Sequence, residues 1–295
     1  MNMIEVLLLL AVVGFGNKYA GEPFQLGFSA RSAALGSADA LFSEGATAVA
    51  SNPAGLSSFP KKWNFTLTHT ELFSGALRTD FLAVAKKHDD WRFGAALYLI
   101  STSDIKETDT LADSIVQTGS FGYSFRTLFV GAAKKSFGLT IKVISQDLGR
   151  AKGIGIGLDL GCRKSLGKVM LSVSAHDVTT TPVKWSTGKT EFIMPTLYLG
   201  SKLRISEKLT VGAELETHFE HMKLGSSFST GLLSIDPHLG AEAEVHRNVV
   251  LRVGLNRGAL SFGIGLRISG FGLHYAYLSH SVLGASHRVS LTGSL

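Results

Sequence analysis

Two glycine-rich stretches have the composition of a loop that binds nucleotide phosphates. They are residues 153–157, Gly-Ile-Gly-Ile-Gly, and residues 263–265, Gly-Ile-Gly. A dinucleotide-binding loop needs a strand, a tight turn and then a helix. Here the apolar residues keep alternating through and beyond the glycines, which indicates a strand that continues. These glycines therefore predict no nucleotide site.

Residues 218–221, His-Phe-Glu-His, could in principle bind a metal ion. Residues three apart on a strand face opposite sides, so the two imidazoles converge only if the chain turns, and a solvated loop is the simpler interpretation. Cys162 lies on the apolar face of its segment with no Cys/His metal spacing around it. No Gly-x-Ser-x-Gly motif occurs. The sequence predicts no enzyme, with no catalytic residue, metal site or cofactor.

In the segments that carry these residues, every second residue is apolar. In residues 153–162 the apolar Ile154, Ile156 and Leu158 share one face, and glycines with Asp159 share the other. Only 18% of the 295 residues are charged, against a usual ~25%. No stretch of eighteen apolar residues lies beyond the N-terminus, so a helical membrane span is excluded. A mildly hydrophobic chain of alternating strands is typical of a membrane β-barrel.

The alternation predicts an all-β fold, a 14-stranded antiparallel transmembrane β-barrel. Tight turns such as 136–137 and 269–270 alternate with long connections such as 102–119, 178–191 and 220–236. Short turns on one rim and long loops on the other are characteristic of outer-membrane barrels, although the short connection 257–258 departs from this pattern. The predicted strands are 62–72, 80–87, 91–101, 120–135, 138–147, 153–163, 168–177, 192–204, 208–219, 237–245, 248–256, 259–268, 271–279 and 286–295.

The charges on these strands indicate which face meets lipid. An Arg or Lys at the bilayer midplane costs about 2–4 kcal/mol, so the charged faces must line the lumen and the apolar faces must meet lipid. We expect neighbouring charges to form a lumen charge ladder that anchors a plug or lines a polar path. Its members are Asp159, Glu214, Glu216, Glu242, Glu244, Arg252 and Arg267. The net charge of +6 is dispersed along the chain, which predicts no nucleic-acid partner.

The segment before the first strand has another character. Residues 6–13 are an unbroken apolar run followed by Gly-Phe-Gly, which predicts a signal peptide over 1–16. Residues 17–60 are rich in Ala and predict short helices that end at Asn52-Pro53. A barrel of fourteen strands is wider than its own side chains can fill. We therefore expect residues 17–60 to be a hatch, or plug, in the lumen of a barrel over 61–295.

Several short motifs run along the chain in a fixed order. They are Gly27-Phe28-x-Ala30-Arg31-Ser32-x-Ala34-Leu35-Gly36, Ala46-Thr47-Ala48-x-x-x-Asn52-Pro53-Ala54-Gly55-Leu56, Leu251-Arg252-x-Gly254 and His274-Tyr275-Ala276-Tyr277. Together they resemble the PorV/PorQ family of outer-membrane barrels, relatives of the FadL-type fatty-acid transporters. The resemblance implies a barrel in the bacterial outer membrane, and the even strand count places both of its ends on the periplasmic side. It marks Asn52, Pro53, Ala54, Gly55 and Leu56 as a hatch motif.

The resemblance leaves three functions open. A PorV-type member binds exported proteins or components of a type IX-like secretion system, here through the loops 102–119, 178–191 and 220–236. A FadL-like channel takes up fatty acids or other apolar solutes, with Asn52-Pro53-Ala54 as the movable element. A structural barrel does neither. Outer-membrane lipid is a partner in every case, and the secretion role is the leading expectation.

Overall fold

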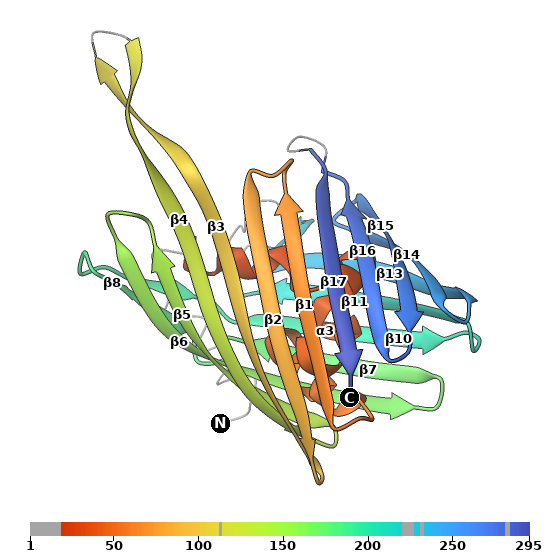
Figure 1. Cartoon of the computed structure of the whole chain (residues 1–295). Helices are drawn as coiled ribbons and strands as arrows, with labels where there is room; N and C mark the ends of the chain where they lie inside the picture. Colours follow the sequence, from red (N-terminus) through yellow and green to blue (C-terminus); the bar gives the residue numbers. More distant parts are fainter. Residues whose placement is uncertain (1–18, 112–113, 220–226, 231–232, 281–283) are drawn as a thin grey trace.

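A computed structural model describes residues 19–111, 114–219, 227–230, 233–280 and 284–295. Within these residues, fourteen antiparallel strands pair in a closed ring (Figure 1). The predicted signal peptide lies outside them. The strands of the ring, in order, are β1 (Trp63–Leu72), β2 (Leu77–His88), β3 (Trp91–Leu111), β4 (Ser114–Lys134), β5 (Phe137–Asp147), β6 (Lys152–Leu166), β7 (Val169–His176), β10 (Thr196–Arg204), β11 (Leu209–His218), β13 (Ser234–His246), β14 (Val249–Asn256), β15 (Ala259–Ile268), β16 (Phe271–Leu278) and β17 (Ser286–Ser294).

The ring closes where the first strand meets the last. β1 and β17 pair with Leu67 opposite Leu291, and the Trp63 and Leu295 backbones exchange hydrogen bonds of 2.8 and 2.9 Å. This junction lies at the rim that carries the tight turns. In one of them Ser269 and Gly270 have φ of 47° and 88°, the left-handed conformation that suits a two-residue hairpin. The predicted strand number and the tight turns are thus confirmed.

Three of the expected long loops contain strand structure. Residues 102–119 largely extend β3 and β4 into a hairpin that projects beyond its neighbours (Figure 1). Residues 178–193 include β8 (Thr181–Trp185) and β9 (Thr190–Ile193), and β8 pairs with the start of β6. A two-residue strand β12 (Phe228–Ser229) pairs with β13. The loop prediction was wrong here because these segments lack the one-sided apolar alternation by which membrane strands are recognised.

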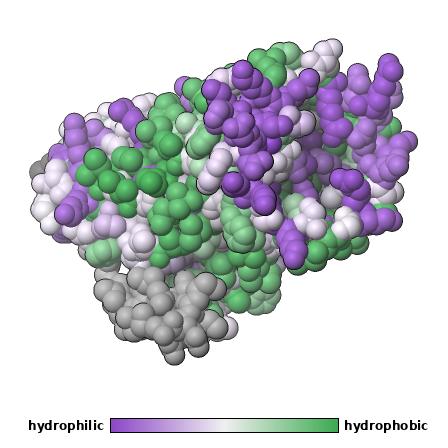
Figure 2. All heavy atoms as spheres, turned by 90° about the horizontal axis from the view of Figure 1, so that it is seen from below, coloured by the Kyte–Doolittle hydropathy of each residue, from purple (hydrophilic) through white to green (hydrophobic). Residues whose placement is uncertain are grey.

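The outer surface of the ring is apolar. Alternate side chains such as Val130 and Ile156 are 54% and 62% exposed, and the predicted lipid-facing Leu215, Leu251 and Val253 are also exposed. Figure 2 shows hydrophobic atoms gathered left of centre and along the lower edge of this view, and hydrophilic ones over the upper middle and the right. An apolar surface of this extent requires a membrane or another apolar partner. No helix within the described residues is long and apolar enough to span a bilayer.

Short helices of the hatch fill the interior (Figure 1). Their apolar core with the barrel lies against β2–β5: Phe28 packs with ring centroids 5.1 Å from Tyr98 and 5.3 Å from Phe81. Against β13 and β14 the hatch approaches so closely that a side chain at Gly254 would collide with the Gly36 backbone. The helices are η1 (Tyr19–Leu26), α2 (Ala30–Ala34), α3 (Asp39–Phe42), η2 (Gly45–Thr47), α4 (Ala48–Ser51) and η3 (Pro53–Ser58).

The assignment of the outer face to lipid can be tested at Ile264. This residue is 39% exposed and lies between Leu251 and Tyr275 on neighbouring strands. We expect Ile264→Arg to lower the free energy of unfolding in lipid vesicles by about 2–4 kcal/mol, because it places a charge against the acyl chains. Urea titration of the reconstituted protein measures this. Ile264→Val is the matched control and should be nearly neutral; equal tolerance of both substitutions would contradict the assignment of this face.

Candidate functional site

Asn52 joins the hatch to the barrel wall. Its side-chain amide donates to the Ser172 hydroxyl at 2.9 Å and to the carbonyls of Ala40 and Val173, both at 3.2 Å. Its oxygen accepts from the backbone N–H of Ala54 at 3.1 Å, which caps η3. The side chain is fully buried. Asn52 therefore links two parts of the hatch to β7 at once.

The rest of the hatch motif packs against the wall beside Asn52. Pro53, Ala54, Gly55 and Leu56 belong to η3 and are all buried, and η3 contacts β4, β5 and β6. A side chain at Gly161 on β6 would collide with the Asn52 amide. One glycine of the alternating segment thus makes room for the motif.

Arg31 on α2 holds the hatch to the opposite wall. Its Nε and Nη2 each donate to a different oxygen of Glu242 at 3.1 Å, a two-bond fork. Its Nη1 donates to Glu44 at 2.9 Å. Glu242 also accepts from Arg252 at 2.7 Å, and Glu44 accepts from Lys202 at 2.7 Å. Two carboxylates and three cations thus form one network, in which the hatch contributes Arg31 and Glu44.

The charges of this network act on the hatch carboxylates. Burial alone would raise the pKa of Glu44, but the positive charges of Arg31 and Lys202 outweigh it and hold that pKa well below its ordinary value. Asp39, at the start of α3, behaves in the opposite way. Burial raises the pKa of Asp39, and the hydrogen bond from Ser32 and the charge of Arg288 offset this only in part.

A second buried network surrounds Lys142 on β5. Its ammonium group donates to Asp159 at 2.8 Å and to Asp177 at 2.9 Å, and all three side chains are at most 5% exposed. Thr181 donates to Asp177 at 2.6 Å. The sequence did not identify Lys142, although Lys142 stands in register with Gly157, two residues from Asp159.

The structure divides the predicted lumen charge ladder into separate groups. Asp159 belongs to the Lys142 network, and Glu242 and Arg252 belong to the Arg31 network. Glu244 and Arg267 form a partly exposed pair at 2.9 Å near the rim with the tight turns. Glu214 is 1% exposed, and neither of its carboxylate oxygens has a hydrogen-bond partner within the described part of the chain. Glu216 lies in a further cluster.

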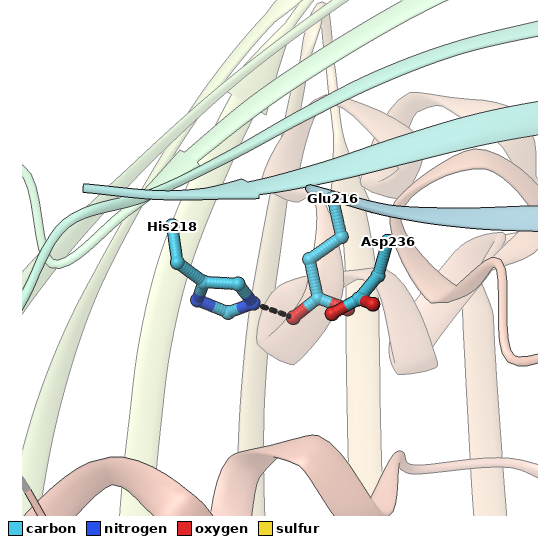
Figure 3. A group of neighbouring side chains, drawn as sticks. All are labelled: Glu216, His218 and Asp236. Carbon is cyan, nitrogen blue, oxygen red and sulfur yellow. Dashed lines mark ion pairs between the residues drawn. The ribbon is translucent and has the colours of Figure 1, made fainter. Parts of the chain in front are cut away.

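That cluster contains Glu216, His218 and Asp236 (Figure 3). His218 Nε2 lies 2.7 Å from one oxygen of Glu216, and His238 Nε2 lies 3.1 Å from the other. Asp236 pairs with Arg257 at 2.8 Å. His218 is 6% exposed at the end of β11, so the solvated-loop interpretation was wrong for this residue. Glu220 and His221 lie outside the described residues.

Two cavities lie on opposite sides of the hatch. The outer cavity, of about 110 Å³, opens where strands end in the longer connections and is lined by hatch residues Phe28, Ser37, Asp39 and Ala40. The inner cavity, of about 300 Å³, lies at the rim with the tight turns and is lined by Ser29, Arg31, Phe42, Ser43 and Glu44. The same short hatch segment, residues 28–44, therefore lines both cavities.

Solved structures with the same architecture are known. The chain matches the Pseudomonas putida toluene transporter TodX at a TM-score of 0.63 and 15% identity, over 92% of this chain and 99% of that one. It matches the Ralstonia pickettii toluene transporter TbuX at 0.60 and 15%, over 91% and 97%. A Pseudomonas aeruginosa FadL homologue gives 0.51 and 12%, over 90% and 97%. The chain has the FadL-type barrel fold.

Other comparisons add no closer relative. No protein-family model matches the chain, and no curated protein matches it. At these identities the solved structures show the fold alone. They agree with the FadL-type part of the resemblance, whereas nothing confirms the specific PorV/PorQ assignment.

The Arg31 fork can be tested by Arg31→Lys. Lysine keeps the charge but cannot make the two-bond contact with Glu242, so we expect the opening free energy of residues 28–44 to fall by about 1.5–3 kcal/mol. Amide hydrogen exchange followed by mass spectrometry measures this opening. Exchange in η3 should stay unchanged, because Asn52 anchors it independently. Unaltered protection of residues 28–44 would contradict the role of the fork.

The Glu44 pairs predict a pH dependence. Because the pKa of Glu44 is lowered on folding, its contribution is complete above its ordinary pKa of 4.5 and is lost as the pH falls through the lowered value. Exchange protection of residues 28–44, corrected for intrinsic rates, should be flat from neutral pH to about pH 5 and weaken in stronger acid. Glu44→Gln should show the weakened protection at every pH. A native profile identical to that of the variant would refute the assignment.

Proposed function

We propose that this protein is an outer-membrane channel for the uptake of hydrophobic small molecules, with the hatch as its movable barrier. The observation that carries the proposal is the pair of cavities on the two sides of residues 28–44. A molecule that displaces this segment passes from one cavity to the other without crossing the barrel wall.

The fold supports transport of apolar molecules. Two of its structural neighbours are described as toluene transporters, and a shared fold alone does not assign a substrate. In this chain the aromatic side of the outer cavity adds a second argument, since Phe24, Phe28 and Phe129 line it. Phe28 and Phe129 pack edge to face with centroids 5.8 Å apart. Aromatic walls of this kind bind apolar solutes through dispersion contacts.

The contacts of the hatch indicate which part moves. Asn52 and η3 are fixed by buried hydrogen bonds and apolar packing, which differs from the expectation that Asn52-Pro53-Ala54 is the movable element. Residues 28–44 also pack through buried apolar side chains, but they carry in addition the ion pairs beside the inner cavity, where Arg31 and Glu44 are partly exposed. Water can replace such partners when they separate. We therefore assign the movement to residues 28–44 and the anchor to residues 52–58.

The proposal includes an orientation and a division of the chain. The tight-turn rim, where β1 begins and β17 ends, faces the periplasm, and the longer connections face outward. Residues 1–16 are the signal peptide, 17–60 the hatch and 61–295 the barrel. This arrangement places the outer cavity on the side from which nutrients arrive.

The test is uptake of radiolabelled toluene, at low concentration, by bacteria whose outer membrane carries the protein and which lack other channels of this type. Met194 lines the outer cavity without taking part in the charged networks. We expect the native protein and Met194→Leu to accelerate uptake equally. Met194→Trp fills the cavity and should reduce uptake toward that of cells without the protein.

Two outcomes would contradict the proposal. One is uptake that does not depend on the protein, as expected for a structural barrel without transport. The other is unreduced uptake by Met194→Trp when heat-modifiability on gels shows a folded barrel, since the cavity would then lie off the path.

The secretion role has no comparable support. None of the structural neighbours cited above is described as a secretion component. Parts of the loop 220–236 lie outside the described residues, and the segment 102–119 is largely a regular hairpin. We therefore favour the channel over binding of exported proteins.

A further inference from the structure

We propose that Glu216, His218 and Asp236 form a binding site for a divalent transition-metal cation, of the class represented by Zn²⁺. Glu216 stands directly opposite Asp236 in the pairing of β11 with β13. The three residues each offer a ligand atom, and these atoms all lie within 4.8 Å of one another. All three side chains point into the barrel interior (Figure 3). The proposal does not depend on the channel function.

The donor set fits such an ion. One imidazole nitrogen and two carboxylate oxygens are ligands that Zn²⁺ and its neighbours in the first transition row accept. The set contains no cysteine thiolate, the ligand that favours soft metals such as Cu⁺. Water from the cavity would complete the coordination.

Each of the three side chains is held by a second partner. His218 Nδ1 lies 3.1 Å from the Thr196 hydroxyl, which leaves Nε2 directed at Glu216. His238 contacts the far oxygen of Glu216 at 3.1 Å. Asp236 accepts from the Ser227 backbone at 2.7 Å and pairs with Arg257 at 2.8 Å. Metal ligands in proteins are oriented by outer contacts of this kind.

The buried carboxyl group of Glu214 is a second, independent observation. Glu214 is on the same inward face of β11 as Glu216 and directly opposite His238. It is 1% exposed with both oxygens unpartnered among the described residues. Glu214 thus places a third carboxyl group beside those of Glu216 and Asp236. A buried polar group needs a partner, and a divalent cation in the cluster would supply one.

The cluster borders the outer cavity. Glu216, His218, His238 and Arg257 all line it. A cation in this cavity therefore reaches Glu216 and His218 directly.

The experiment is calorimetric titration of the full-length, detergent-solubilised protein with Zn²⁺ after treatment with a chelator. We expect one ion per chain with micromolar or tighter affinity. His218→Ala and Asp236→Asn should each lower the affinity at least about 100-fold, and His238→Ala, which removes an outer contact, by about 10–100-fold. His69→Ala is the matched control, because His69 pairs with Asp80 at 2.7 Å on the exposed outer face. It should bind like the native protein.

Co²⁺ provides a readout that does not depend on a variant folding. Native protein loaded with Co²⁺ should show visible d–d absorption bands that Zn²⁺ abolishes by displacement. Absence of both the bands and stoichiometric Zn²⁺ binding would overturn the proposal. Binding that His218→Ala and Asp236→Asn retain at native affinity, in folded barrels, would overturn it equally.

Discussion

The whole structure depends on one constraint, which is that the side chains of a membrane strand alternate between lipid and lumen. Most outward residues of the ring are therefore apolar, and most buried polar groups point inward. A ring of fourteen strands encloses more space than those inward side chains can fill. The lumen therefore holds charged groups at low exposure, and such groups are stable only when they are paired. The hatch satisfies both requirements, since it fills the space and supplies Arg31 and Glu44 as partners.

The hatch meets the two sides of the lumen in different ways. Toward β2–β5 it packs through Phe28, Val49 and Leu56 in an apolar core. Toward β10–β14 it contacts charged side chains, with Arg31 and Glu44 between Glu242 and Lys202. Residues 52–58 are fixed by apolar packing and buried hydrogen bonds, whereas residues 28–44 combine apolar packing with ion pairs that solvent can replace. A segment held in this unequal way is suited to open at one end while the other stays attached.

Much of the fold could be predicted from the sequence, because membrane strands are defined by a pattern that a single chain displays. The alternation in residues 153–162 indicates a strand, and the cost of a charge in lipid assigns Glu242 and Arg252 to the lumen. The extension of β3 and β4 was missed, since residues such as Lys106 and Glu107 stand where neither face meets lipid. The partners of the lumen charges also could not be predicted. Whether Glu216 meets His238 or Lys142 meets Asp159 depends on the register between strands, which the pattern of one strand does not contain. The spacing of Glu214, Glu216 and His218 on one face was a usable signal for the buried cluster.

We propose that residues 28–44 form a barrier that a solute displaces while residues 52–58 remain anchored. Hydrogen exchange of the protein in lipid, with and without toluene, tests it most directly. The account predicts faster exchange of residues 28–44 when toluene is present and unchanged exchange of residues 52–58. Equal exchange in both conditions for both segments, or faster exchange of residues 52–58 alone, would contradict it.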